Sequence, residues 1–164
     1  MSIAVVYGST TGACADIAAK IADKLGAECL NIAEVSIDQI AGYDALVLGS
    51  STWGAGDLQD DWAGVIDDLS AANLAGKKVA VFGTGDSIGF ADTFAMALVA
   101  LSDAAKAAGA EVVGATAVAG YDDLVTPAAT DGVFPGLAID TQNQPELDDE
   151  RIDAFVAAIA PLLG

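Results

Sequence analysis

The sequence contains no histidine, and its six lysine and arginine residues stand against 24 aspartate and glutamate residues, giving a formal net charge of −18. Histidine is the usual general base and the commonest metal ligand, so its absence argues against a histidine-based active site or metal centre. The shortage of cations argues against nucleic-acid binding, because proteins neutralise phosphates with lysine and arginine. It also disfavours docking on an anionic membrane surface, and the excess of carboxylates favours basic partners instead.

Cysteine and long apolar runs are scarce as well. Only Cys14 and Cys29 are present, and their spacing fits neither a Cys-x-x-Cys nor a zinc motif, so we expect free thiols, with Cys29 in the core of its strand. No apolar run approaches the length of a membrane span. The N-terminal residues MSIAVVYG lead directly into a strand without a preceding basic segment, which predicts a cytoplasmic protein with no signal peptide.

The composition predicts one folded domain spanning residues 1–164, because 54% of the residues are hydrophobic and this length supports a full core. Most of the acidic residues are aspartate. This excess fits either a surface adapted to high salt or ordinary solvated helix faces, and stability that rises with KCl would favour the former.

Short apolar runs alternate with segments of helical periodicity. Strands are expected at residues 2–8, 27–32, 45–51, 77–85 and 111–118. Helices are expected at residues 12–25, 37–41, 61–69 and 94–108, and after the acidic run 148–150. This alternation, with continuously apolar strands, predicts an α/β doubly wound fold with a parallel sheet between two helical layers. Ligands of such sheets bind beyond the carboxyl ends of the strands, where the strand order reverses.

The segment YGSTTGACADIA, residues 7–18, follows the first strand and has the composition of a phosphate-binding loop. Ser9, Thr10 and Thr11 offer hydroxyls, Gly12 permits close backbone approach, and the helix that follows favours an anion at its N-terminus. A simple Ser/Thr helix cap is the alternative, although a cap needs only one hydroxyl. Because the Gly-x-x-x-x-Gly-Lys-[Ser/Thr] motif is absent, we expect a phosphate that is held permanently and not transferred.

Two further loops, at residues 50–60 and 83–92, are expected at the same edge of the sheet. Trp53 and Phe90 lie in these loops, where they either sandwich a flat ring or close the edge of the core. Gly83, Gly85 and Gly89 do not match the Gly-x-Gly-x-x-Gly motif, so they carry no dinucleotide signal. The stretch 119–136 has no clear period and is expected to be a loop.

Four ordered motifs resemble the flavodoxins, specifically their long-chain group. They are GSTTG, STWGAGDLQDDW, FGTGDSIGFADTF and GLAIDTQNQPELDDERI. The resemblance extends over essentially the whole chain. It implies a flavodoxin-like three-layer sandwich whose five-stranded parallel sheet has the order 2-1-3-4-5, with residues 119–136 as the insertion that splits the fifth strand.

The resemblance also implies non-covalently bound FMN. Residues 9–14 wrap its phosphate, mostly through backbone N–H groups. Trp53 and Phe90 cover the two flavin faces, and Asp86 meets the polar pyrimidine or ribityl edge. In the family, the peptide at Gly54–Ala55 turns its carbonyl toward flavin N5 and so stabilises the semiquinone, a turn that glycine permits. The candidate FMN-binding residues are Ser9, Thr10, Thr11, Gly12, Ala13, Cys14, Ser51, Thr52, Trp53, Gly54, Ala55, Gly83, Thr84, Gly85, Asp86, Phe90 and Asp92.

Two residues depart from the pattern of the family. Cys14 stands where members often have threonine, and Phe90 where they often have tyrosine, so each position loses a good hydrogen-bond donor. We expect FMN to bind somewhat less tightly as a result. Cys14 has an alternative role as a redox thiol, because a helix N-terminus lowers the pKa of a thiol.

The implied function is that of a low-potential, one-electron carrier and not an enzyme. As a monomer, it would shuttle electrons between an NADPH- or ferredoxin-type reductase and acceptor oxidoreductases, through basic surfaces on those partners. An FMN-dependent NAD(P)H:quinone-type oxidoreductase is the main alternative, and a cofactor-free binding module is another. A phospho-receiver domain is excluded, because the first and third strands end in VVYGS and VLGSS without the required acidic residues.

Overall fold

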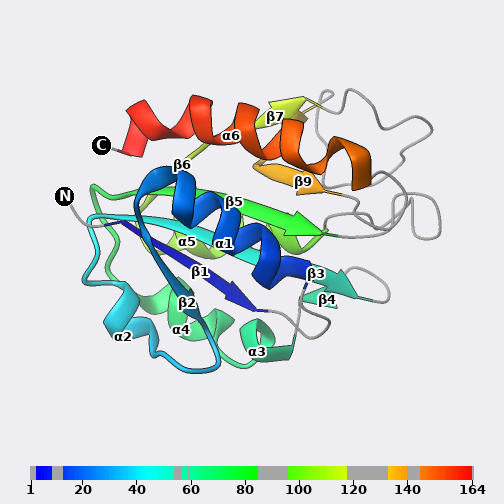
Figure 1. The fold of residues 1–164 in the computed structure, drawn as a ribbon. Coiled ribbons are helices and arrows are strands. Elements are labelled where there is room, and N and C mark those ends of the chain that lie inside the picture. Colours follow the sequence, from blue (N-terminus) through cyan, green and yellow to red (C-terminus); the bar gives the residue numbers. More distant parts are fainter. Residues whose placement is uncertain are drawn as a thin grey trace.

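The structure is a computed structural model that describes residues 3–8, 13–53, 57–58, 60–84, 96–117, 133–139 and 145–163. Its central sheet has the order β2-β1-β3-β5-β6, and all of these strands are parallel (Figure 1). Their bounds are β1 Ile3–Gly8, β2 Glu28–Asn31, β3 Ala45–Trp53, β5 Lys78–Thr84 and β6 Glu111–Val113. The expected strand order 2-1-3-4-5 is therefore confirmed.

The last strand of the sheet is split, as predicted. β6 pairs with Lys78–Ala80 of β5, and β9, Leu137–Ile139, pairs with Phe82–Thr84 of the same strand. Between the two halves, β7 (Thr116–Ala117) pairs antiparallel with β8 (Val133–Phe134) in a separate small sheet. The Thr116 hydroxyl also donates a hydrogen bond to the Gly136 carbonyl, at 2.6 Å.

The expected bounds in this region are partly wrong. The strand predicted over residues 111–118 leaves the central sheet after Val113, because Gly114 has a positive φ of 88° and packs against Phe155 and Ile159. Val133 and Phe134, expected in a loop, form β8 instead. Residues 118–132 lie outside the described residues.

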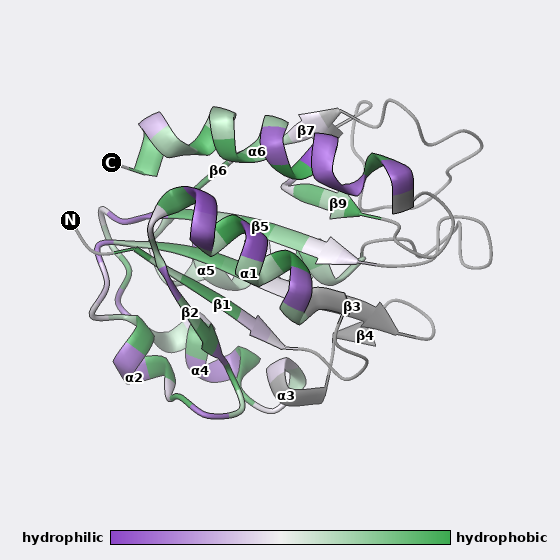
Figure 2. Ribbon diagram, viewed as in Figure 1, coloured by the Kyte–Doolittle hydropathy of each residue, from purple (hydrophilic) through white to green (hydrophobic). Residues whose placement is uncertain are grey.

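Helices cover both faces of the sheet (Figures 1 and 2). α1, Ala13–Leu25, and α6, Asp148–Leu163, pack against one face, with a 3-10 turn at Pro145–Leu147 before α6. The other face carries α2 (Ile37–Ile40), α3 (Asp60–Ala63), α4 (Ile66–Ala71) and α5 (Met96–Ala107). The expected three-layer sandwich is confirmed.

Alternation along each strand divides the core between these two layers. In β1, Val5 faces α1 and α6, whereas Ala4 and Val6 face the other layer. β3 and β5 repeat the pattern, with Val47 and Ala80 on the α1 side. The apolar stripe predicted for the last helix is also confirmed, because its five residues are all buried: Ile152, Phe155, Val156, Ile159 and Leu163.

Three local predictions are wrong. The helix expected at residues 61–69 is broken at Gly64 and Val65, where glycine has low helix propensity and Val65 has a non-helical ψ of 3°. The last helix begins at Asp148, so the acidic run forms its first turn, which suits the helix dipole. Cys29 is exposed, because β2 is the outermost strand of the order. In the part of the chain that the structure describes, no helix is long and apolar enough to span a membrane.

Candidate functional site

The carboxyl ends of β1, β3 and β5 lie side by side at one edge of the sheet. Gly8 at the end of β1 pairs with Ser50, and Ser51 pairs with Thr84 at the end of β5. From β1 the chain crosses to β2 on one side, whereas β3 lies on its other side, so the strand order reverses between β1 and β3. The three predicted loops therefore start from neighbouring positions, at the point where ligands bind in such sheets.

The first predicted loop joins this edge to the start of α1. β1 ends at Gly8 and α1 begins at Ala13, so Ala13 and Cys14 form the first turn of that helix. Ser9, Thr10, Thr11 and Gly12 lie outside the described residues. The short connection brings the positive end of the α1 dipole to the carboxyl edge, where it favours a bound anion.

The second predicted loop begins with a hairpin. β3 continues through Ser51, Thr52 and Trp53, and it pairs antiparallel with β4, Asp57–Leu58, in the register Thr52 to Leu58 and Trp53 to Asp57. The prediction that Trp53 lies in a loop is therefore wrong. Threonine and tryptophan favour strands, and the antiparallel pairing with Asp57 and Leu58 extends β3 through Trp53. Gly54 and Ala55 lie outside the described residues.

The third predicted loop begins in β5. Gly83 and Thr84 are its last two residues, and Thr84 is buried together with its neighbour Ser50. A Cβ atom at position 83 would lie 3.1 Å from the Ser50 carbonyl oxygen and 3.3 Å from the Leu98 side chain, so glycine lets these elements approach closely. Gly85, Asp86, Phe90 and Asp92 lie outside the described residues.

The two lysines of α1 are engaged with carboxylates of α6. Lys20 and Lys24 of α1 form ion pairs with Asp149 and Asp153 of α6, at 2.9 and 2.6 Å. The hydrogen bond with Lys20 holds the pKa of Asp149 below its ordinary value of 3.8, and the same bond raises the pKa of Lys20. These pairs tie the two helices together on one face of the sheet.

Two further lysines lie at the opposite edge of the sheet. Lys77 donates hydrogen bonds to the carbonyls of Ala41 and Tyr43, both at 2.6 Å, and Lys78 forms an ion pair with Glu111. Lys78 is the first residue of β5 and Lys77 directly precedes it, and Lys106 lies in the last turn of α5. These three lysines are therefore remote from the carboxyl edge of the sheet.

Trp62 is a residue of this region that the sequence analysis did not assign. It lies in α3, just after the hairpin, and its side chain is fully buried. Its indole Nε1 donates a hydrogen bond of 2.6 Å to the carbonyl of Gly49 in β3. The sequence offered little sign of this role, because the neighbours Asp60 and Asp61 indicate a solvent-exposed helix start.

The described part of the site supplies binding surfaces and little titratable chemistry. Among the described residues, no group of three or more histidine, cysteine, aspartate or glutamate side chains is arranged to hold a metal ion. The carboxyl edge offers the start of α1, which favours an anion, the two buried hydroxyl residues Ser50 and Thr84, and the β3–β4 hairpin. Such an arrangement suits a phosphate-bearing ligand that is held in place.

Comparisons with known proteins agree with this geometry. A family model described as flavodoxin matches residues 5–155. The flavodoxin of Picosynechococcus sp. is 40% identical to this chain, with 99% of this chain and 98% of that relative covered. Flavodoxin 2 of Escherichia coli is 38% identical, with 97% and 95% covered. The crystal structure of Fusobacterium nucleatum flavodoxin bound to flavin mononucleotide superposes with a TM-score of 0.92 at 27% identity, with 99% of both chains covered.

Proposed function

Because the chain belongs to the flavodoxin family, we propose that it is an electron carrier that holds FMN non-covalently at the carboxyl edge of β1, β3 and β5. The observation that carries this proposal is the convergence of these three strand ends with the start of α1 at the switch point of the sheet. The full-length similarity to a flavodoxin with FMN bound supports the same assignment.

The donor set of the first loop fits the phosphate of FMN. Ser9, Thr10, Thr11 and Gly12, together with the helix start at Ala13 and Cys14, would hold it through hydroxyls and backbone N–H groups. Four of the five lysines are ion-paired or bonded to backbone carbonyls, which agrees with a phosphate bound without a lysine. A group that stays bound and does not react needs no cation to activate it.

The other two loops would hold and orient the flavin ring. Trp53 would cover one face and Phe90 the other, and so exclude water from the ring. A second group of residues would line the polar edge and the ribityl chain: Ser51, Thr52, Gly54, Ala55, Gly83, Thr84, Gly85, Asp86 and Asp92. FMN itself would supply the one-electron chemistry, and the protein would tune it through contacts and charge.

The charge of the chain favours a low reduction potential. Each carboxylate about 10 Å from an added electron costs roughly 0.4 kcal/mol at water-like dielectric. Several aspartates follow or occupy the three loops, and the net charge is −18. Their combined field disfavours the addition of negative charge, and added salt weakens this effect.

The same charge suits basic partners. We propose that this protein acts as a cytoplasmic monomer that receives electrons from an NADPH- or ferredoxin-type reductase and passes them to acceptor oxidoreductases. Opposite charges on such partners would speed their encounter and orient the two proteins.

The spectrum of the purified protein tests this function. We expect a yellow protein that releases FMN on denaturation and takes up two electrons in separate one-electron steps during a potentiometric titration. Steady oxidation of NAD(P)H by the protein alone would point instead to a quinone-type oxidoreductase. A colourless protein that leaves added FMN unbound would refute the proposal.

A further inference from the structure

We propose that Trp62 is a positioning residue that fixes one wall of the FMN site, although it lies too deep in the core to touch the cofactor. The inference rests on the proposed function for the identity of the ligand. It starts from one contact: the buried Trp62 Nε1 donates to the Gly49 carbonyl at 2.6 Å. This is a short bond between a helix and the strand from which the hairpin extends.

That hydrogen bond closes a loop around the site. Between Gly49 and Trp62 lie the end of β3, residues 54–56, strand β4 and the start of α3. This segment carries Trp53 and the adjacent candidate residues Gly54 and Ala55. Because the Trp62–Gly49 hydrogen bond holds the two ends of this segment together, it also limits how far the hairpin moves.

The hairpin needs such an anchor, because its own secondary structure is minimal. β4 has two residues and pairs with β3 only at Thr52–Leu58 and Trp53–Asp57. α3 has four residues, too few for a helix that is stable by itself. Two-stranded hairpins are at best marginally stable in water, so a tertiary contact has to hold this segment in place.

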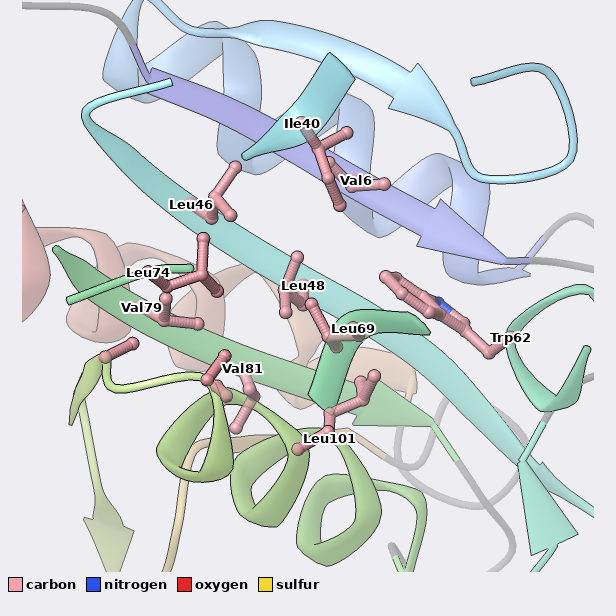
Figure 3. Close-up of a cluster of buried hydrophobic side chains, with 14 of the residues drawn as sticks. Val6, Ile40, Leu46, Leu48, Trp62, Leu69, Leu74, Val79, Val81 and Leu101 are labelled. Carbon is pink, nitrogen blue, oxygen red and sulfur yellow. The ribbon is translucent and has the colours of Figure 1, made fainter. Parts of the chain in front are cut away.

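Trp62 provides that contact through packing as well as through the hydrogen bond. Its ring is 0% exposed and belongs to the core cluster that includes Val6, Leu48 and Leu69 (Figure 3). The cluster that contains the indole thus joins α3 to two strands of the sheet and to α4. Because the ring is fully buried, a change of its position would disturb several close-packed neighbours.

The acceptor is held equally firmly from the opposite face of the sheet. A Cβ atom at Gly49 would lie 2.0 Å from Cζ of Phe82, so the Phe82 ring lies directly against the Gly49 backbone. Phe82 belongs to the core cluster that includes α1 and α6, whereas Trp62 belongs to the other cluster. Gly49 is therefore fixed between two large aromatic side chains on opposite faces of the sheet, and it provides a rigid point of attachment for the hairpin.

Trp62→Phe tests the proposal, because it removes the indole N–H and keeps an aromatic ring. The matched control is Ile159→Val, a buried residue in the distal half of α6 that packs beside Gly114. In Trp62→Phe we expect the dissociation constant of FMN to rise about tenfold, or ~1.4 kcal/mol. We also expect the first one-electron potential to shift, because a displaced wall contacts oxidised and reduced flavin unequally. Ile159→Val should change neither quantity.

A second readout needs no cofactor. In the apoprotein, amide hydrogen exchange at residues 52 and 58 should accelerate in Trp62→Phe relative to exchange at Val5 and Val47 in the central strands. If exchange at the hairpin, FMN affinity and the first potential all match those of Ile159→Val, the positioning role is wrong, even though wild-type protein still binds FMN. If wild-type protein fails to bind FMN, the proposed function falls, and accelerated hairpin exchange would still support Trp62 as the anchor.

Discussion

Gly136→Ala is expected to destabilise the protein strongly, because Gly136 lies directly against the backbone of β5. A Cβ atom at this position would lie 2.0 Å from the Val81 carbonyl oxygen, 2.6 Å from Val81 Cγ2 and 2.8 Å from the Val81 carbonyl carbon. Ordinary contact begins near 3.4 Å, so the two segments would have to separate by more than 1 Å. A backbone carbonyl within a sheet cannot rotate away as the end of a flexible side chain can.

The separation would affect the half of the split strand nearest the carboxyl edge, where we propose that FMN binds. Leu137, the next residue, pairs with Phe82, and the Gly136 carbonyl accepts the Thr116 hydrogen bond. Overpacking costs about 1–3 kcal/mol, and weakening one hydrogen bond adds about 1 kcal/mol. For a domain of this size, a total loss of about 2–4 kcal/mol lowers the melting temperature by roughly 5–15 °C.

Urea unfolding followed by circular dichroism measures this loss. Gly42→Ala is the matched control, because its Cβ atom would lie an ordinary 3.5 Å from the Gln39 carbonyl oxygen. We expect that variant to unfold within about 0.5 kcal/mol of wild type. If Gly136→Ala did the same, the close approach of Gly136 to Val81 would be wrong.

Three further predictions follow from charge and exposure. Asp149→Asn removes the ion pair with Lys20. That pair lowers the pKa of Asp149 in the folded protein below the ordinary value of 3.8. The ion pair therefore stabilises the fold above pH 3.8, and this stabilisation is lost as the pH falls through the pKa of Asp149 in the folded protein. Urea unfolding of the variant and wild type should therefore differ at pH 7 and converge in strong acid, and an equal difference at every pH would contradict this account. Cys29 is exposed, but partial desolvation raises the pKa of its thiol above the ordinary value of 9.0. Alkylation of Cys29 by iodoacetamide should therefore be slow at neutral pH and accelerate above about pH 9. Rapid alkylation at neutral pH would contradict the raised pKa. The net charge of −18 predicts a melting temperature that rises between about 0.1 M and about 2 M KCl, and a flat response would argue against a surface adapted to salt.

The two-faced core was predictable from local pattern, whereas the strand order was predicted from the resemblance to the flavodoxins. Apolar residues are continuous in the central strands and recur at helical spacing in α6, so the periodicity itself indicates which surfaces are buried. The motifs then pointed to the edge at which β1, β3 and β5 end together. The individual contacts of the candidate FMN-binding residues remain predictions.

What the sequence did not reveal depends on partners that are distant along the chain. Trp53 lies in a strand because residues 57–58 return to pair with it, and glycine-rich composition had suggested a loop. Cys29 looks like a core residue in an apolar run, but its strand is outermost in the sheet. Trp62 follows two aspartates, and only the folded structure shows that its N–H reaches Gly49. In each case the outcome is set by tertiary packing and not by local propensity.

The split strand also limits edge-to-edge aggregation of this protein. Long, flat strands at the border of a sheet act as templates onto which a second molecule can add. Here β5 is bordered by two separate pieces of three residues each, β6 and β9, and β2 at the other border has four residues. Neither border therefore offers a long continuous row of backbone groups within the described sheet. Interrupting the last strand thus protects against aggregation in a way that does not depend on the repulsion between carboxylates, so it persists where salt or acid removes that repulsion.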